Sequence, residues 1–212
     1  MLGIAKGDFV SFEFMSKLYD KLALYKTAHL CINPARPRTL VQSQRRWGGC
    51  VYRVAILEPA PRGLAARLGD FLLALEQSPP VQISHGTDLT DFSGAYDLFV
   101  ADSFSNAILL PADLSCRALL LPGGVQMAAF SQIPSKWVVS FGLSSKDSIT
   151  VSSLTPDSAL LALQRELVTL SGQVIEQQEI PISIPPSTSA SGVMAFYGAL
   201  LLLGVPPKRL AV

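Results

Sequence analysis

Residues 136–154, KWVVSFGLSSKDSITVSSL, contain two different strand patterns on either side of a short break. The first run, 137–141, is rich in aromatic and β-branched residues, which is typical of a strand buried within a sheet. The break begins at Gly142, which can adopt backbone angles that end a strand. Residues 148–152 then alternate polar and apolar side chains, the period of a strand with one solvated face. The stretch therefore predicts a buried sheet strand that leads into antiparallel structure.

Strand-like runs upstream of this stretch alternate with helical patterns. The expected strands are 51–57, 81–84, 96–101 and 118–121. Leucine and phenylalanine recur at helical spacing from Leu64 to about Gln77, and a short helix is expected over 125–131. Strands that alternate with helices over short connections predict a Rossmann-like α/β fold with a mainly parallel sheet.

The pattern changes after residue 150. Two further strands are expected at 159–163 and 173–184, with a Ser-Gly turn and no helix between them, so the sheet should gain an antiparallel extension. An apolar helix over 193–203, ended by Gly204, should close the fold. The diproline at 206–207 can open one more helical turn.

The first fifty residues differ from the rest of the chain. They contain eight Lys and Arg against three acids, a net charge of +5, whereas the remainder contains nine against thirteen, a net charge of −4. Residues 32–50 lack apolar periodicity and contain prolines and glycines, which is typical of a loop or linker. We therefore expect a basic, poorly ordered leader over 1–50 and a single α/β domain over 51–212.

Two alternatives for the leader remain open. Residues 34–47 could form a basic arm that binds nucleic acid, although the disordered leader is the preferred interpretation. Residues 45–49 can also be encoded by purine-rich codons that resemble a bacterial ribosome-binding site. In that case Val51 is the start codon and the leader is not native.

The compartment and the partner classes follow from the cysteines and the apolar runs. Cys31, Cys50 and Cys116 are odd in number and show no CxxC spacing, so the sequence predicts neither a disulfide framework nor a zinc site. The apolar run 193–205 is shorter than the roughly 18 residues that a membrane span requires. We expect a soluble cytoplasmic protein without a membrane partner.

No phosphate loop, dinucleotide fingerprint, nucleophile elbow or HExxH motif occurs, and the sequence predicts no cofactor and no metal. Polar residues do follow the expected parallel strands, at the edge where such sheets bind ligands. The candidate ligand-binding residues are Arg62, His85, Asp102, Ser103, Gly123 and Gly124. A rival interpretation makes His85, Asp102 and Ser103 the site of a small hydrolase or transferase. The preferred interpretation of these three residues is a solvated loop histidine beside turn-forming residues, because no strained nucleophile turn accompanies Ser103.

The second half of the chain resembles the later part of the central domain of Mur ligases and folylpolyglutamate synthetases. The matching stretches are WVVSFGL (137–143), SITVSSL (148–154) and SGVMAFYGALLLLGVPPKRL (191–210). The family's phosphate loop and its magnesium-binding acidic residues have no counterpart here. Ser191-Gly192 stands where a His-Asn pair precedes the closing helix. The resemblance thus implies the fold without ligase activity, as in small uncharacterised bacterial proteins that keep the sheet.

The leading hypothesis is a non-catalytic α/β protein, Mur-ligase-like in its core. It would bind an unidentified small ligand or a protein partner. Only the resemblance implies a link to cell-wall metabolism.

Overall fold

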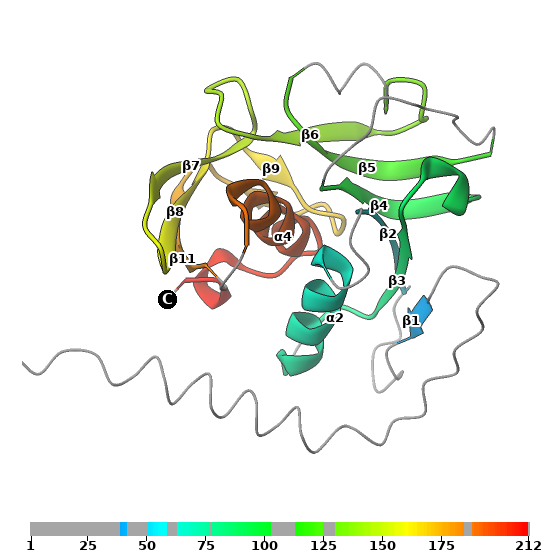
Figure 1. Cartoon of the computed structure of the whole chain (residues 1–212), viewed down its shortest axis with the longest axis horizontal. Helices are drawn as coiled ribbons and strands as arrows, with labels where there is room; N and C mark the ends of the chain where they lie inside the picture. The colour runs from blue at the N-terminus through cyan, green and yellow to red at the C-terminus, as the bar shows by residue number, and fades with distance from the viewer. Residues whose placement is uncertain are drawn as a thin grey trace, which may run out of the picture. The chain divides into compact units, whose positions relative to one another are not determined.

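The structure is a computed structural model of the chain (Figure 1). The residues that it describes are 39–41, 51–58, 63–76, 78–102, 113–124, 130–184 and 188–211. No helix among these residues is long and apolar enough to cross a membrane.

The core of the fold is a nine-stranded sheet with the order β1-β3-β2-β4-β5-β6-β7-β8-β11. Its strands are β1 (Thr39–Val41), β2 (Tyr52–Leu57), β3 (Val81–Gly86), β4 (Ala95–Ala101), β5 (Ser115–Pro122), β6 (Trp137–Phe141), β7 (Ile149–Leu154), β8 (Ser158–Leu163) and β11 (Glu179–Ser183). The strands from β3 to β6 pair in parallel, whereas β7, β8 and β11 pair antiparallel with one another. This arrangement confirms the predicted mainly parallel α/β sheet with an antiparallel extension.

Strands β6 and β7 meet at a single parallel pair, Phe141 with Ile149. Parallel neighbours ordinarily need a crossover connection of a dozen or more residues. Here β7 begins beside the point where β6 ends, so the short segment 142–148 only shifts the chain sideways by one strand. Two backbone bonds hold the shift: Gly142 N donates to Ile149 O at 3.0 Å, and Ser148 N donates to Ser140 O at 2.9 Å. The break in the sequence is therefore the junction between the parallel and antiparallel parts of the sheet.

One face of the sheet carries helices α2 (Leu64–Ala74) and α4 (Ala190–Leu202). Figure 1 shows α4 in the concave side of the curved sheet, with α2 beside it. A helix that is apolar on all sides is expected to be buried all round, and α4 contacts α2 and strands β4, β5, β6 and β7. Gly198 permits this close packing, because a Cβ atom there would lie 2.9 Å from Ile149 Cδ1. The predicted closing helix is thus the centre of the main core.

A second apolar cluster covers the opposite face of the sheet. Phe92 meets Tyr96 and Phe99 edge to face, with the ring centroids of Phe92 and Phe99 5.2 Å apart. The short 3₁₀ helix η1 (Leu89–Asp91) leads into this cluster. Since β2, β4 and β5 contribute side chains to both clusters, their continuous apolar sequences follow from burial on both faces.

Several boundaries differ from the sequence-based expectation. Residues 39–41, assigned to a loop, form β1 against β3, because three residues are too few to show periodicity in sequence. The expected strand 173–184 is two strands, β10 (Val174–Ile175), which pairs with β9 (Leu167–Val168), and β11. The extra helical turn is confirmed as the 3₁₀ helix η2 (Pro207–Arg209).

Helix α4 begins three residues earlier than predicted. The Ser189 hydroxyl accepts a hydrogen bond from Gly192 N at 3.0 Å and so caps the helix. The expected helix over 125–131 falls mostly on residues 125–129, which lie outside the described part of the chain. The domain boundary at Val51 and the disordered leader also remain predictions.

Candidate ligand-binding site

The parallel strands bring the predicted polar residues to the same edge of the sheet. His85 lies near the carboxyl end of β3, Asp102 follows β4, and Gly123 and Gly124 follow β5. Two further candidates, Arg62 and Ser103, lie outside the described residues. The described candidates belong to three different environments.

The first environment is the N-terminus of α2, where Glu58 is only 2% exposed. Its carboxylate accepts hydrogen bonds from the backbone amides of Leu64 and Ala65, the latter at 2.9 Å. These are the unpaired N–H groups that make a helix N-terminus an anion site. The chain's own carboxylate therefore fills the position that a ligand phosphate would take after the first parallel strand.

His85 belongs to the same environment. Its Nε2 atom lies 3.6 Å from Glu58 Oε1, too far for a hydrogen bond but close enough for electrostatic attraction. Nε2 is buried and has no hydrogen-bond partner among the described residues. The His85 imidazole thus lies next to the Glu58 carboxylate that caps α2.

The second environment joins the starts of α2 and α4. Arg67 Nη1 donates to Thr188 Oγ1 at 2.5 Å, and Ser191 Oγ donates to the Asp102 carbonyl at 3.4 Å. Burial raises the pKa of the Asp102 carboxyl, and the positive charge of Arg67 partly offsets this effect. These contacts fix the segment that leads into α4, so their role is to position that helix.

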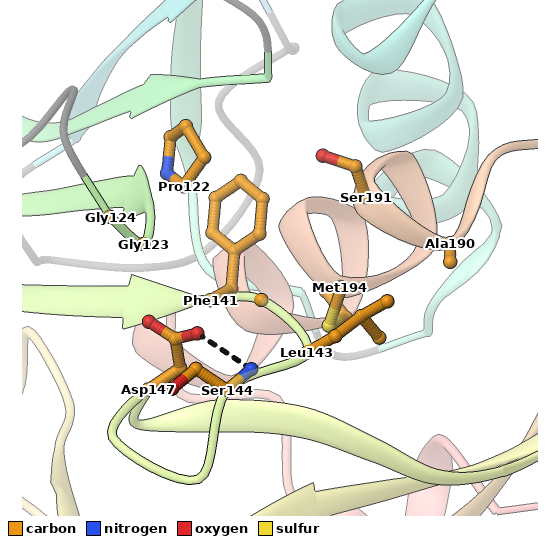
Figure 2. Close-up of a pocket in the computed structure, with 11 residues that line it drawn as sticks. Pro122, Gly123, Gly124, Phe141, Leu143, Ser144, Asp147, Ala190, Ser191 and Met194 are labelled. Carbon is orange, nitrogen blue, oxygen red and sulfur yellow. Dashed lines mark hydrogen bonds between the residues drawn. The ribbon is translucent and has the colours of Figure 1, made fainter.

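The third environment is a pocket of about 340 Å³ between the ends of β5 and β6 and the first turn of α4 (Figure 2). Its lining residues come from three segments that are distant in sequence. They are Pro122, Gly123, Gly124, Phe141, Gly142, Leu143, Ser144, Asp147, Ala190, Ser191 and Met194. The segment 142–147 that moves the chain from β6 to β7 therefore also forms one wall of the pocket.

Asp147 holds this wall together. Its side chain is 6% exposed, and Oδ2 accepts a hydrogen bond from Ser144 N at 3.2 Å. A Cβ atom on Gly123 would lie 1.9 Å from Asp147 Oδ1, and one on Gly142 would lie 2.4 Å from Oδ2. Both distances are shorter than any van der Waals contact, so only glycine lets the carboxylate enter between the two strand ends.

The described lining combines apolar side chains with few polar groups. Phe141 is buried at the end of β6, Met194 faces the pocket from α4, and Leu143 is 77% exposed at its edge. Such a lining is typical of small-molecule sites, in which a few polar groups fix the orientation of the ligand. No histidine or cysteine is present among these lining residues to activate the hydroxyls of Ser144 and Ser191.

Another potential nucleophile, Cys116, lies in the second apolar cluster, on the opposite face of the sheet from α4. Cys116 on β5 is 8% exposed, and burial raises the pKa of its thiol to about 12. The thiolate is the reactive form of cysteine, so this side chain is chemically inert near neutral pH.

Sequence reasoning identified Gly123 and Gly124 but missed Asp147, Met194 and Ser191. Asp147 is separated from Ser191 and Met194 by more than forty positions in the chain, and only the packing of α4 under the strand ends brings the three together. One local signal was available, since a glycine follows each of two neighbouring buried strands, at Gly123 and Gly142. No family model matches the sequence, and no curated protein matches it either.

Proposed function

We propose that this chain is a non-catalytic α/β protein that binds a small ligand in the pocket between β5, β6 and α4. The observation that carries the proposal is the pocket itself, a cavity of about 340 Å³ with a buried carboxylate in an apolar lining. Cavities of roughly 300–1,000 Å³ accommodate small organic ligands. The two glycines that admit Asp147 support a shaped site rather than an accidental gap.

The resemblance to the central domain of Mur ligases suggests the setting of this function. We infer from it a bacterial cytoplasmic protein that takes part in cell-wall metabolism by binding and without ligase chemistry. Glu58 is consistent with this inference, because its carboxylate occupies the N-terminus of α2, where a nucleotide phosphate would ordinarily bind.

A hydrolase or transferase at the same edge receives less support. His85 lies near Glu58, and Asp102 lies beside Arg67 and Ser191, so His85 and Asp102 each have other neighbours. A nucleic-acid arm in the leader falls on residues outside the described part of the chain, apart from the three of β1.

A fragment screen by ligand-observed NMR tests the proposal on the full chain. Ser191→Trp places a large ring at the pocket edge, where the native side chain is only partly buried, and should abolish the binding of most hits. Leu73→Trp is the matched control, because Leu73 is 63% exposed on α2. The proposal fails if no fragment binds, or if the hits bind Ser191→Trp and Leu73→Trp equally well.

A further inference from the structure

No described residue supplies a charged partner for the Asp147 carboxylate. Among the described residues, the hydrogen bond that it accepts is the one from Ser144 N to Oδ2, and none of their ion pairs includes it. Figure 2 shows the carboxylate between Ser144 and the end of β5, on the wall of the pocket. Buried carboxylates are ordinarily paired or fully hydrogen-bonded, because burial of an isolated charge is costly. Oδ1 thus has capacity for a donor that the described residues do not supply.

The neighbouring sequence offers no cation to fill this role. The segments that continue directly from the lining residues, 125–129 and 185–187, contain no Lys, Arg or His. Lys146 precedes Asp147 but is exposed, and its carbonyl accepts a hydrogen bond from Arg165 Nη2 at 2.6 Å. Arg165 is exposed as well. Both basic residues therefore lie at the surface.

The remainder of the pocket favours a hydrocarbon group. Phe141 and Met194 supply an apolar wall, and the exposed side chain of Leu143 offers further apolar surface that a ligand could cover. The first turn of α4 carries a partial positive charge of about half a unit, which is smaller than the full charge of the carboxylate. The Ser189 hydroxyl already accepts a hydrogen bond from the Gly192 amide and so caps this turn. The turn therefore has one fewer free N–H group to offer to an anionic ligand.

We infer that the pocket binds a small amphiphilic organic cation. Its ammonium group donates to Asp147 Oδ1, and its hydrocarbon part packs against Phe141, Leu143 and Met194. This inference rests on the proposed function, and it adds the charge and polarity of the ligand.

Three probes with the same alkyl chain test the charge preference by titration calorimetry on the full chain: n-hexylammonium, n-hexanol and n-hexanoate. Hexylammonium should bind at least about tenfold more tightly than hexanol, the ratio expected for a charge-assisted hydrogen bond. Hexanoate should bind most weakly. Asp147→Asn should reduce the affinity for hexylammonium to that for hexanol and leave hexanol binding unchanged.

The outcomes separate this inference from the proposed function. If all three probes bind equally and Ser191→Trp abolishes their binding, the charge preference is wrong and the pocket remains a ligand site. If the fragments of the screen bind but none of the three probes does, the ligand class is wrong. If neither fragments nor probes bind, both proposals are wrong. Should Asp147→Asn fail to fold, the ratio of hexylammonium to hexanol affinity in the unaltered chain decides the question.

Discussion

The Asp147 carboxylate occupies the space in which Gly123 would carry a side chain, since a Cβ atom there would lie 1.9 Å from Oδ1. Gly123→Ala should therefore displace the carboxylate and lower the free energy of unfolding by about 1–3 kcal/mol, as for other overpacked sites. Chemical denaturation measures this cost. In an Asp147→Ala background the clashing atoms are gone, so the same glycine substitution should cost at least about 0.5 kcal/mol less. Equal costs in the two backgrounds would show that the two residues do not compete for this space.

Helix α4 should be the main source of stability in the larger core. Leu200 is fully buried, so Leu200→Ala should lower the free energy of unfolding by roughly 2–5 kcal/mol through the cavity that it leaves. Leu73→Ala on the exposed side of α2 is the control and should change it by no more than about 0.5 kcal/mol. A cost below about 0.5 kcal/mol at Leu200 would place α4 at the periphery of the fold.

Nucleotide should not stabilise this protein. Because Glu58 satisfies the first amides of α2, millimolar ATP with magnesium should leave the melting temperature unchanged. Glu58→Ala removes this internal anion and should cost about 0.5–2 kcal/mol, the range for loss of a helix cap. Inorganic phosphate should then raise the melting temperature of Glu58→Ala but not that of the exposed control Glu76→Ala. A saturable shift of the unaltered chain with ATP would reveal a phosphate site elsewhere.

Asp102 should make a pH-dependent contribution to stability. Burial raises the pKa of its carboxyl above the ordinary value of 3.8, with Arg67 opposing the shift. A raised pKa means that the folded state binds the proton more tightly, so stability is lost as the pH rises from 3.8 through the folded-state pKa. Asp102→Asn removes this loss. The difference in free energy of unfolding, variant minus unaltered chain, should therefore increase over that pH interval and then level off. A difference that decreases as the pH rises would contradict the assigned cause.

The sequence predicted the elements whose signal is local. Strand β6 was expected at 137–141 because aromatic and β-branched residues favour a buried strand, and the structure has it there. The start of α4 was missed because Ala190, Ser191 and Gly192 are too small to show an apolar face. Strand β1 was missed because its order comes from pairing with β3 and not from its own three residues.

The candidate site was predicted only in part, for a related reason. Gly123 was selected from its position after a strand, which requires only the order of elements along the chain. In the sequence Asp147 falls only in the break between two expected strands, and its importance arises when the ends of β5 and β6 lie side by side. Met194 looked like any core residue of an apolar helix, and its place in the lining depends on how α4 packs under the sheet.

The central claim is that the pocket between β5, β6 and α4 is where this protein binds its ligand. The most direct measurement is the NMR spectrum of protein labelled with ¹³C at the methionine methyl groups, titrated with the tightest hit of the screen. Met194→Leu assigns the Met194 resonance. The account predicts a saturable shift of this resonance with the same Kd as the overall binding isotherm. Saturable binding that leaves the Met194 resonance unmoved would contradict it.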